Sequence, residues 1–206
     1  MATKRTTREI LEHAEETLFT ARLGLDHLRG KDPKARIAGL RNIVVFGRAV
    51  TNVLQNLRST EPTFDAWYQP HVDLMRADPL LRYFYELRSQ ILKQGSVAVG
   101  SSMTFSGNPM ALIQRFKPPP RAKSFFVGDN IGGSGWEVET DDGSTEKFYV
   151  TIPGDVPGIK LDMNIHLTDA PDEHKRLPAS DVCEEFLGKL SALLSEAKAH
   201  FAKSAT

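Results

Sequence analysis

Apolar residues recur at alternating steps of three and four positions through most of the first 95 residues, a pattern that predicts amphipathic helices. The first helix follows a capping box, Thr6-x-x-Glu9, and is expected to end at Gly30. Two later helices begin at Asp32-Pro33 and Asp78-Pro79, where Asp caps the helix and Pro takes the first helical position. These local signals predict three of the helix starts.

The second helix is apolar on more than one side, which predicts a central position with several neighbours. Gly47 in its middle would allow another helix to approach closely. A third helix is expected after residues 59–62, with Pro70 kinking or splitting it. The fourth ends at Gly95, a C-cap residue. Four helices joined by short turns predict an up-down bundle over residues 1–95.

After Gly95 the period changes to that of strands separated by Gly and Pro turns. The run 117–121 contains three consecutive prolines and is the candidate boundary or spacer. An Asp-Gly turn at 141–144 predicts a hairpin, and 159–167 alternates as a further strand. A last helix from Pro178 has one apolar face that must cover either the sheet or the bundle.

The predicted fold class is therefore α+β, an up-down four-helix bundle followed by a small antiparallel β-sheet and a C-terminal helix. The expected parts are the bundle over residues 1–95, the β segment over 96–177 and the packing helix over 178–206. Whether the β segment packs on the bundle or extends from the proline spacer stays open.

Composition adds little to this picture. The chain has 26 basic and 26 acidic residues, and residues 1–95 hold 15 Lys and Arg against 11 Asp and Glu. This excess of positive charge is too small to indicate a nucleic-acid-binding protein, and it does not exclude one. A single cysteine, Cys183, allows no intrachain disulfide, and no uninterrupted apolar run of membrane length is present. We therefore expect a cytoplasmic protein with no membrane contact, and Cys183 as a small buried residue.

The most suggestive segment is the fourth helix, in which Arg88-Ser89 is followed by Lys93. Residues 6–95 resemble HEPN-like domains, four-helix proteins that include ribonucleases of toxin and defence systems, and whose motif is Arg, a polar residue, then His. Arg88 and Ser89 match the first two motif places, whereas Lys93 stands where the His would be. The resemblance implies a homodimer formed through the motif helices.

RNA cleavage without metal needs a group that moves a proton and a cation that stabilises the phosphorane. Arg88 suits the second role, but Lys93 would need a strongly lowered pKa for the first. The leading hypothesis is thus a non-catalytic dimeric binding or regulatory protein that contacts RNA or a nucleotide in a defence or toxin–antitoxin setting. The alternatives are an active ribonuclease using Arg88 and Lys93, and a structural protein that only contacts other proteins.

The predicted ligand-binding residues are Arg88, Ser89, Lys93 and Arg48. Arg41, Arg48 and Arg58 share one edge of the second helix, as a phosphate-binding strip or as the polar border of a buried helix. The loop 128–135 is glycine-rich but lacks the lysine and the helix of a P-loop. The Asp and His residues between 162 and 174 match no closed zinc pattern. No cofactor and no metal is expected.

Overall fold

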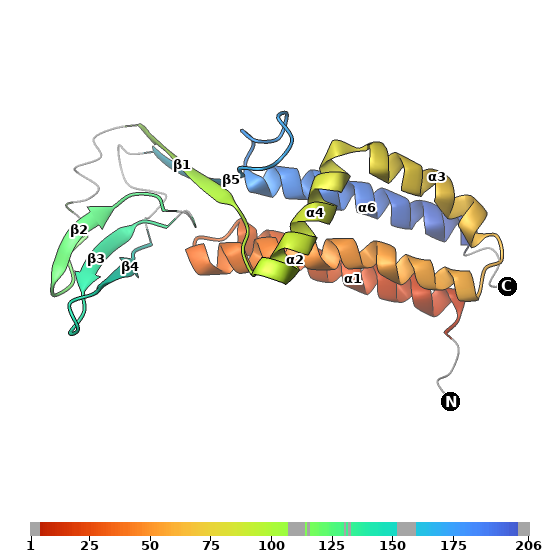
Figure 1. Cartoon of the computed structure of the whole chain (residues 1–206), viewed down its shortest axis with the longest axis horizontal. Helices are drawn as coiled ribbons and strands as arrows, with labels where there is room; N and C mark the ends of the chain where they lie inside the picture. Colours follow the sequence, from red (N-terminus) through yellow and green to blue (C-terminus); the bar gives the residue numbers. More distant parts are fainter. Residues whose placement is uncertain are drawn as a thin grey trace.

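The computed structural model describes residues 5–106, 114, 116–129, 131, 133–151 and 160–201. Its helices and strands follow one another in the order α1 (Thr7–Leu28), α2 (Pro33–Leu54), the 3₁₀ helix η1 (Gln55–Ser59), α3 (Phe64–Ala77), α4 (Pro79–Gln94), β1 (Val99–Ser106), β2 (Ala122–Phe126), β3 (Gly135–Glu139), β4 (Thr145–Tyr149), β5 (Lys160–Leu167) and α6 (Ala179–Phe201). The predicted α+β class is confirmed, with helices first, antiparallel strands next and a C-terminal helix last (Figure 1).

Side-chain caps fix the helix starts at the predicted residues. Thr6 and Glu9 form both hydrogen bonds of the capping box at α1. The carboxylates of Asp32 and Asp78 accept hydrogen bonds from the first backbone N–H groups of α2 and α4. Gly95 ends α4 with φ of 68°, in the left-handed region that favours glycine.

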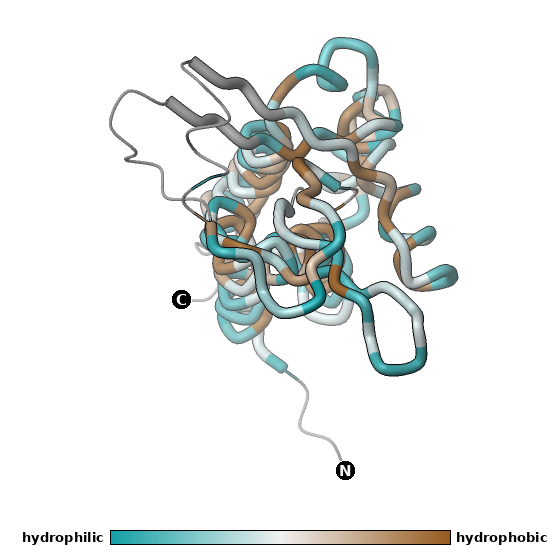
Figure 2. Tube along the Cα trace, turned by 90° about the vertical axis from the view of Figure 1, so that its left-hand side faces the viewer, coloured by the Kyte–Doolittle hydropathy of each residue, from teal (hydrophilic) through white to brown (hydrophobic). Residues whose placement is uncertain are grey.

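The helical core is shared by the four N-terminal helices and α6. α1, α2 and α6 run side by side along the molecule, and α6 also contacts α4 and β5 (Figure 1). The C-terminal helix therefore covers the bundle as well as one strand. Viewed end-on, hydrophobic and hydrophilic segments alternate along the helices (Figure 2), as expected when one face of each helix is buried.

Two close approaches set the positions of these helices. α1 crosses α2 where Gly24 meets Gly39, and a Cβ added to Gly24 would lie 2.6 Å from the Gly39 carbonyl oxygen. α6 approaches α2 at Gly47, whose added Cβ would lie 2.5 Å from Phe186. The ring of Phe186 stacks on Phe84 of α4 with centroids 3.9 Å apart. The expectation that Gly47 admits a neighbouring helix is confirmed.

α3 is the least buried of the helices. Only Phe64 and Tyr68 of its residues are buried, and both belong to its first half. Pro70 lies inside α3, but the helix continues to Ala77 and is not split. The second half of α3 therefore stands at the surface, and Asp78 joins it directly to α4.

The strands form two small antiparallel sheets. β1 pairs with β5 from Val99 opposite Leu167 to Ser106 opposite Lys160. β2, β3 and β4 form a three-stranded sheet with β3 in the centre. The predicted hairpin turn joins β3 to β4, and Gly143 occupies it with φ of 81°. The two-stranded ribbon leads from α4 out to the second sheet and back towards α6 (Figure 1).

Within the described residues, one helical stretch, Pro33–Ser59, is long and apolar enough to cross a membrane by length and composition alone. Several of its apolar residues, including Leu40, Ile43 and Leu54, are fully buried in the core of the bundle, whereas Phe46 is exposed. The buried residues are therefore accounted for by packing against α1, α4 and α6.

Candidate anion-binding cleft

The predicted residues of α4 have different surroundings. Arg88 and Ser89 are half-buried, whereas Lys93 is exposed in the last turn of the helix. The Ser89 hydroxyl donates to the backbone carbonyl of Tyr85 at 3.3 Å. Five residues along an α-helix correspond to a rotation of about 140°, so Arg88 and Lys93 leave α4 in different directions.

The structure brings Arg48 of α2 and Arg88 of α4 together. Both side chains are half-buried. Burial lowers the pKa of Arg48, and the nearby charge of Arg88 lowers this pKa further, against the opposite effects of Tyr68 and Tyr85. The Arg48 guanidinium lies over the Tyr85 ring, 5.2 Å from its centroid.

Neither arginine forms an ion pair with any residue that the structure describes, and the buried Nε of Arg88 has no hydrogen-bond partner among them. Two adjacent, partly desolvated cations without a counter-ion are unfavourable in the empty protein. This pair is therefore an electrostatic arrangement that an anion would stabilise.

Arg48 lines a cleft of about 680 Å³ between α2, η1, α3 and α4, with α6 at its base. The residues that line it are Arg48, Thr51, Gln55, Arg58, Tyr68, Gln69, Val72, Met75, Arg76, Leu81, Arg82, Tyr85, Glu86, Phe186 and Leu190. They include four arginines and one carboxylate, Glu86. Arg88, Ser89 and Lys93 are not among the lining residues.

The other arginines of the predicted strip on α2 take two different roles. Arg58 lines the cleft, where its Nε donates to Asp65 at 2.7 Å and its Nη1 donates to Gln55 at 3.0 Å. Arg41 instead donates to the carbonyl oxygen of Gly95 at 2.6 Å and so holds the end of α4. Of the three arginines of the predicted strip, Arg48 and Arg58 line the cleft and Arg41 does not.

Two arginines of the cleft were missed by the sequence reasoning. Arg76 ends α3 and Arg82 lies in the first turn and a half of α4, on either side of the Asp78 junction. Both side chains are exposed, and neither forms an ion pair with the described residues. Their spacing of six residues across a helix junction carries no periodic signal, so the tertiary structure was needed to find them.

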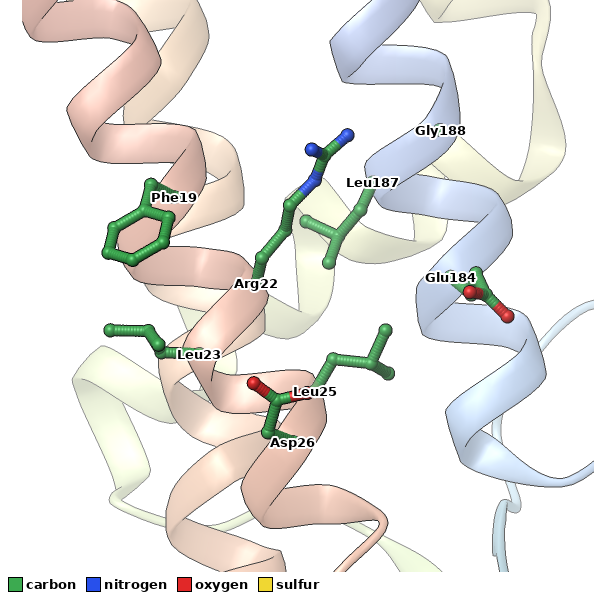
Figure 3. A pocket seen from close by; sticks show the side chains of 8 residues that line it. All are labelled: Phe19, Arg22, Leu23, Leu25, Asp26, Glu184, Leu187 and Gly188. Atoms are coloured by element: carbon green, nitrogen blue, oxygen red, sulfur yellow. The ribbon is translucent and has the colours of Figure 1, made fainter.

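A second pocket, between α1 and α6, has a different charge balance. Its volume is about 460 Å³, and Arg22 faces it together with Asp26 and Glu184 (Figure 3). Arg22 donates to the Ser191 hydroxyl at 3.1 Å. Because two acidic residues accompany its single arginine, this pocket does not have the excess of positive charge that the cleft has. Arg22 is therefore a suitable control position for substitutions of the cleft arginines.

The glycine-rich loop between β2 and β3 is organised around a carboxylate. Oδ1 of Asp129 accepts hydrogen bonds from the backbone N–H groups of Ile131 and Gly133, and Oδ2 accepts from Tyr149 and Lys147. Burial and the hydrogen bond to Asp129 raise the pKa of Tyr149 to about 12. These N–H groups bind a side chain of the protein itself, so they are not available to cradle a phosphate.

The two histidines of the segment 162–174 have different partners. His166 contacts Ser102 and the carbonyl oxygen of Leu177, and His174 contacts Glu185 at 3.1 Å. In the described part of the chain no group of three or more His, Cys, Asp and Glu side chains has the arrangement of a metal site. Cys183 is buried in α6, as predicted, and burial raises the pKa of its thiol.

Comparison with known protein families gives a match to part of the chain. A family model described as bacteriophage lambda protein ea47 matches residues 31–106. No curated protein and no solved structure matches the chain. The matched segment runs from the residues before α2 to the end of β1, and so contains all four arginines that line the cleft.

Proposed function

We propose that this protein is a non-catalytic binding protein that holds the phosphate groups of RNA or of a nucleotide in the arginine-lined cleft. The observation that carries the proposal is Arg48, a half-buried arginine of the cleft that has no ion-pair partner among the described residues and whose charge is further disfavoured by Arg88 nearby. Arg76 and Arg82 add exposed positive charge at the mouth of the same cleft.

Arginine suits this task because its planar guanidinium donates two parallel hydrogen bonds to phosphate and keeps its charge at all physiological pH values. Tyr85 adds an aromatic face beside Arg48. A phosphate bound in the cleft would neutralise the charge of Arg48, which the nearby charge of Arg88 repels in the empty protein. Binding is therefore expected to stabilise the fold by an amount that grows with the logarithm of the ligand concentration once this exceeds the dissociation constant.

The surroundings of Lys93 favour binding over cleavage. A lysine acts as a general base when burial or a neighbouring cation lowers its pKa, but Lys93 is exposed. It also leaves α4 about 140° away from Arg88, which does not favour both side chains acting on one phosphate. The active ribonuclease is thus the less supported of the two hypotheses.

The wider setting is also part of the proposal. A HEPN-like relationship over residues 6–95 would make the protein a cytoplasmic homodimer with a regulatory role in a defence or toxin–antitoxin system. Sedimentation velocity at 1–100 micromolar tests the dimer, and a monomer throughout that range would remove the shared-site model.

Binding is tested by fluorescence anisotropy with a labelled RNA oligonucleotide, and by competition with unlabelled nucleotides, at low and at moderate salt. We expect Arg48→Ala and Arg82→Ala to weaken binding at least tenfold, and affinity to fall with added salt. The control is Arg22→Ala in the pocket of Figure 3, which removes the same charge elsewhere and should leave affinity unchanged. Equal losses in all three variants, or no binding by the wild type, would refute the proposal.

A cleavage assay separates the two hypotheses. Wild-type protein and Lys93→Ala are incubated with mixed RNA in the presence of EDTA, and the products are resolved on a denaturing gel. We expect no cleavage by either protein. Cleavage by the wild type that Lys93→Ala abolishes would establish the ribonuclease instead.

A further inference from the structure

We infer that the occupant of the cleft is a free nucleotide with a chain of phosphates, whose base lies on the apolar floor and whose phosphates reach the arginines. This inference rests on the proposed function and deepens it, because it names the ligand. It follows from the layering of the cleft, from the buried polar groups beside the floor and from the number of unpaired charges.

The cleft has an apolar floor and a charged rim. The floor is formed by side chains that are buried or half-buried, namely Val72, Met75, Leu81, Phe186 and Leu190. The rim is formed by exposed side chains, of which Arg58, Arg76, Arg82 and Glu86 are charged. A ligand that fills the cleft therefore needs an apolar or aromatic body as well as anionic groups, and phosphate alone would leave the floor uncovered.

Polar side chains stand beside the floor. Thr51 and Tyr68 line the cleft although they are only 2% and 4% exposed. The Thr51 hydroxyl donates to the backbone carbonyl of Arg48 and is also a hydrogen-bond partner of the Tyr68 side chain. Gln55 donates to the Thr51 carbonyl oxygen, accepts a hydrogen bond from Arg58 and is a second partner of Tyr68. These side chains form a polar network at the edge of the floor, and the polar edge of a base that lies on the floor would meet this network.

The shape and size also favour a small molecule over an RNA strand. A volume of about 680 Å³ falls within the range of about 300–1,000 Å³ that is usual for small-molecule sites. Single-stranded nucleic acid is usually held in an extended groove that follows its backbone. Here the walls come from α2 with η1, from α3 and from α4, and α6 closes the base.

The charges match a chain of phosphates. Asp65 already pairs with Arg58, so Arg48, Arg76 and Arg82 are the lining arginines without an ion pair to a described residue. These three arginines stand on three different helices, Arg48 on α2, Arg76 at the end of α3 and Arg82 near the start of α4. A chain of phosphates can contact more of these cations at once than a single phosphate can.

The test is isothermal titration calorimetry of the full-length protein with the four ribonucleoside triphosphates, adenosine and inorganic tripolyphosphate, alongside anisotropy with a labelled ten-nucleotide RNA. We expect at least one triphosphate to bind ten times more tightly than tripolyphosphate, adenosine or the RNA. Val72→Trp places a ring on the floor, and should weaken triphosphate binding at least tenfold while changing tripolyphosphate binding less than threefold.

The matched control is Leu74→Trp, the same type of enlargement on α3 at a side chain that is 67% exposed and does not line the cleft. It should bind like the wild type, and circular dichroism checks that both variants fold. Tripolyphosphate binding as tightly as every triphosphate, or RNA binding more tightly than all of them, would overturn this inference and leave the proposed anion-binding function standing. If no anion binds at all, both proposals fail.

Discussion

Substitution of Gly39 by alanine tests whether the contact between α1 and α2 is as close as the structure has it. A Cβ on Gly39 would lie 2.8 Å from both the His27 Cβ and the Leu28 backbone nitrogen, and closer still to the Gly24 carbonyl oxygen. These are mainly backbone atoms of α1, which cannot rotate away as the end of a flexible side chain can. The two helices would have to separate.

The expected magnitude is the difference between two effects. Overpacking a well-packed core costs about 1–3 kcal/mol, and the upper end applies because the obstacle is backbone. Replacing a mid-helix glycine by alanine contributes about 1 kcal/mol in the opposite direction. Gly39→Ala should therefore lower the free energy of unfolding by about 2 kcal/mol.

Gly188 in α6 provides the matched control, because an added Cβ there has no described atom within 4 Å. Gly188→Ala should raise the free energy of unfolding by up to about 1 kcal/mol. Both variants are measured by urea denaturation followed by far-ultraviolet circular dichroism. Equal stability of the two variants would show that α1 and α2 do not approach as closely as described, and would refute the reasoning.

Three further predictions concern single side chains. Tyr83→Phe should leave stability unchanged or raise it slightly in urea denaturation, because the buried Tyr83 hydroxyl has no hydrogen-bond partner among the described residues. Phe186→Ala should cost about 3–5 kcal/mol in the same assay, since Phe186 stacks on Phe84 and fills the space at Gly47. Burial works to raise the pKa of Asp78, but hydrogen bonds from Lys189 and from the first N–H groups of α4 outweigh it and leave this pKa lowered. A lowered carboxylate pKa stabilises the fold above the unfolded-state value and loses that effect as pH falls through the folded-state value. Asp78→Asn keeps a capping side chain, so in urea denaturations at several pH values it should be less stable than the wild type by about 0.5–1 kcal/mol at pH 7, and this difference should shrink as the pH falls below about 4.

The helix boundaries could be predicted because their causes are local. A capping box needs only Thr6 and Glu9, and an Asp-Pro pair fixes both the cap and the first helical residue. The position of α6 could not be predicted in the same way. Its apolar stripe shows only that one face is covered, and Gly47 shows only that some helix approaches. That these two features meet at Phe186 depends on contacts about 140 residues apart in the sequence.

The residues of the candidate site also fall into those that the local sequence predicts and those that only the tertiary structure brings together. Arg48 and Arg58 could be found because they repeat along one edge of α2 and η1, and the edge faces the cleft. The same periodicity also selected Arg41, whose guanidinium binds the Gly95 carbonyl oxygen instead. A helical repeat gives the side of the helix on which a residue lies, but not the neighbour it meets further along. Arg76 and Arg82 have no repeat in common with α2, so only the path of the chain from α3 into α4 brings them to the cleft.

The placement of the cleft in the fold explains why it can hold unpaired charges. α2 and α6 are fixed by buried contacts over their whole length, so Arg48 and the floor residues Phe186 and Leu190 stand on a rigid base. The second half of α3 has no buried residue, and it is tied to the base through Asp78 and its ion pair with Lys189 at 2.6 Å. The rigid floor would hold the apolar part of a bound ligand in one position. The second half of α3, which carries Arg76 and is lightly packed, could move slightly to bring Arg76 to the ligand's negative charge. The packing of the other helices sustains the repulsion between Arg48 and Arg88, and under the proposed function an anion would relieve it.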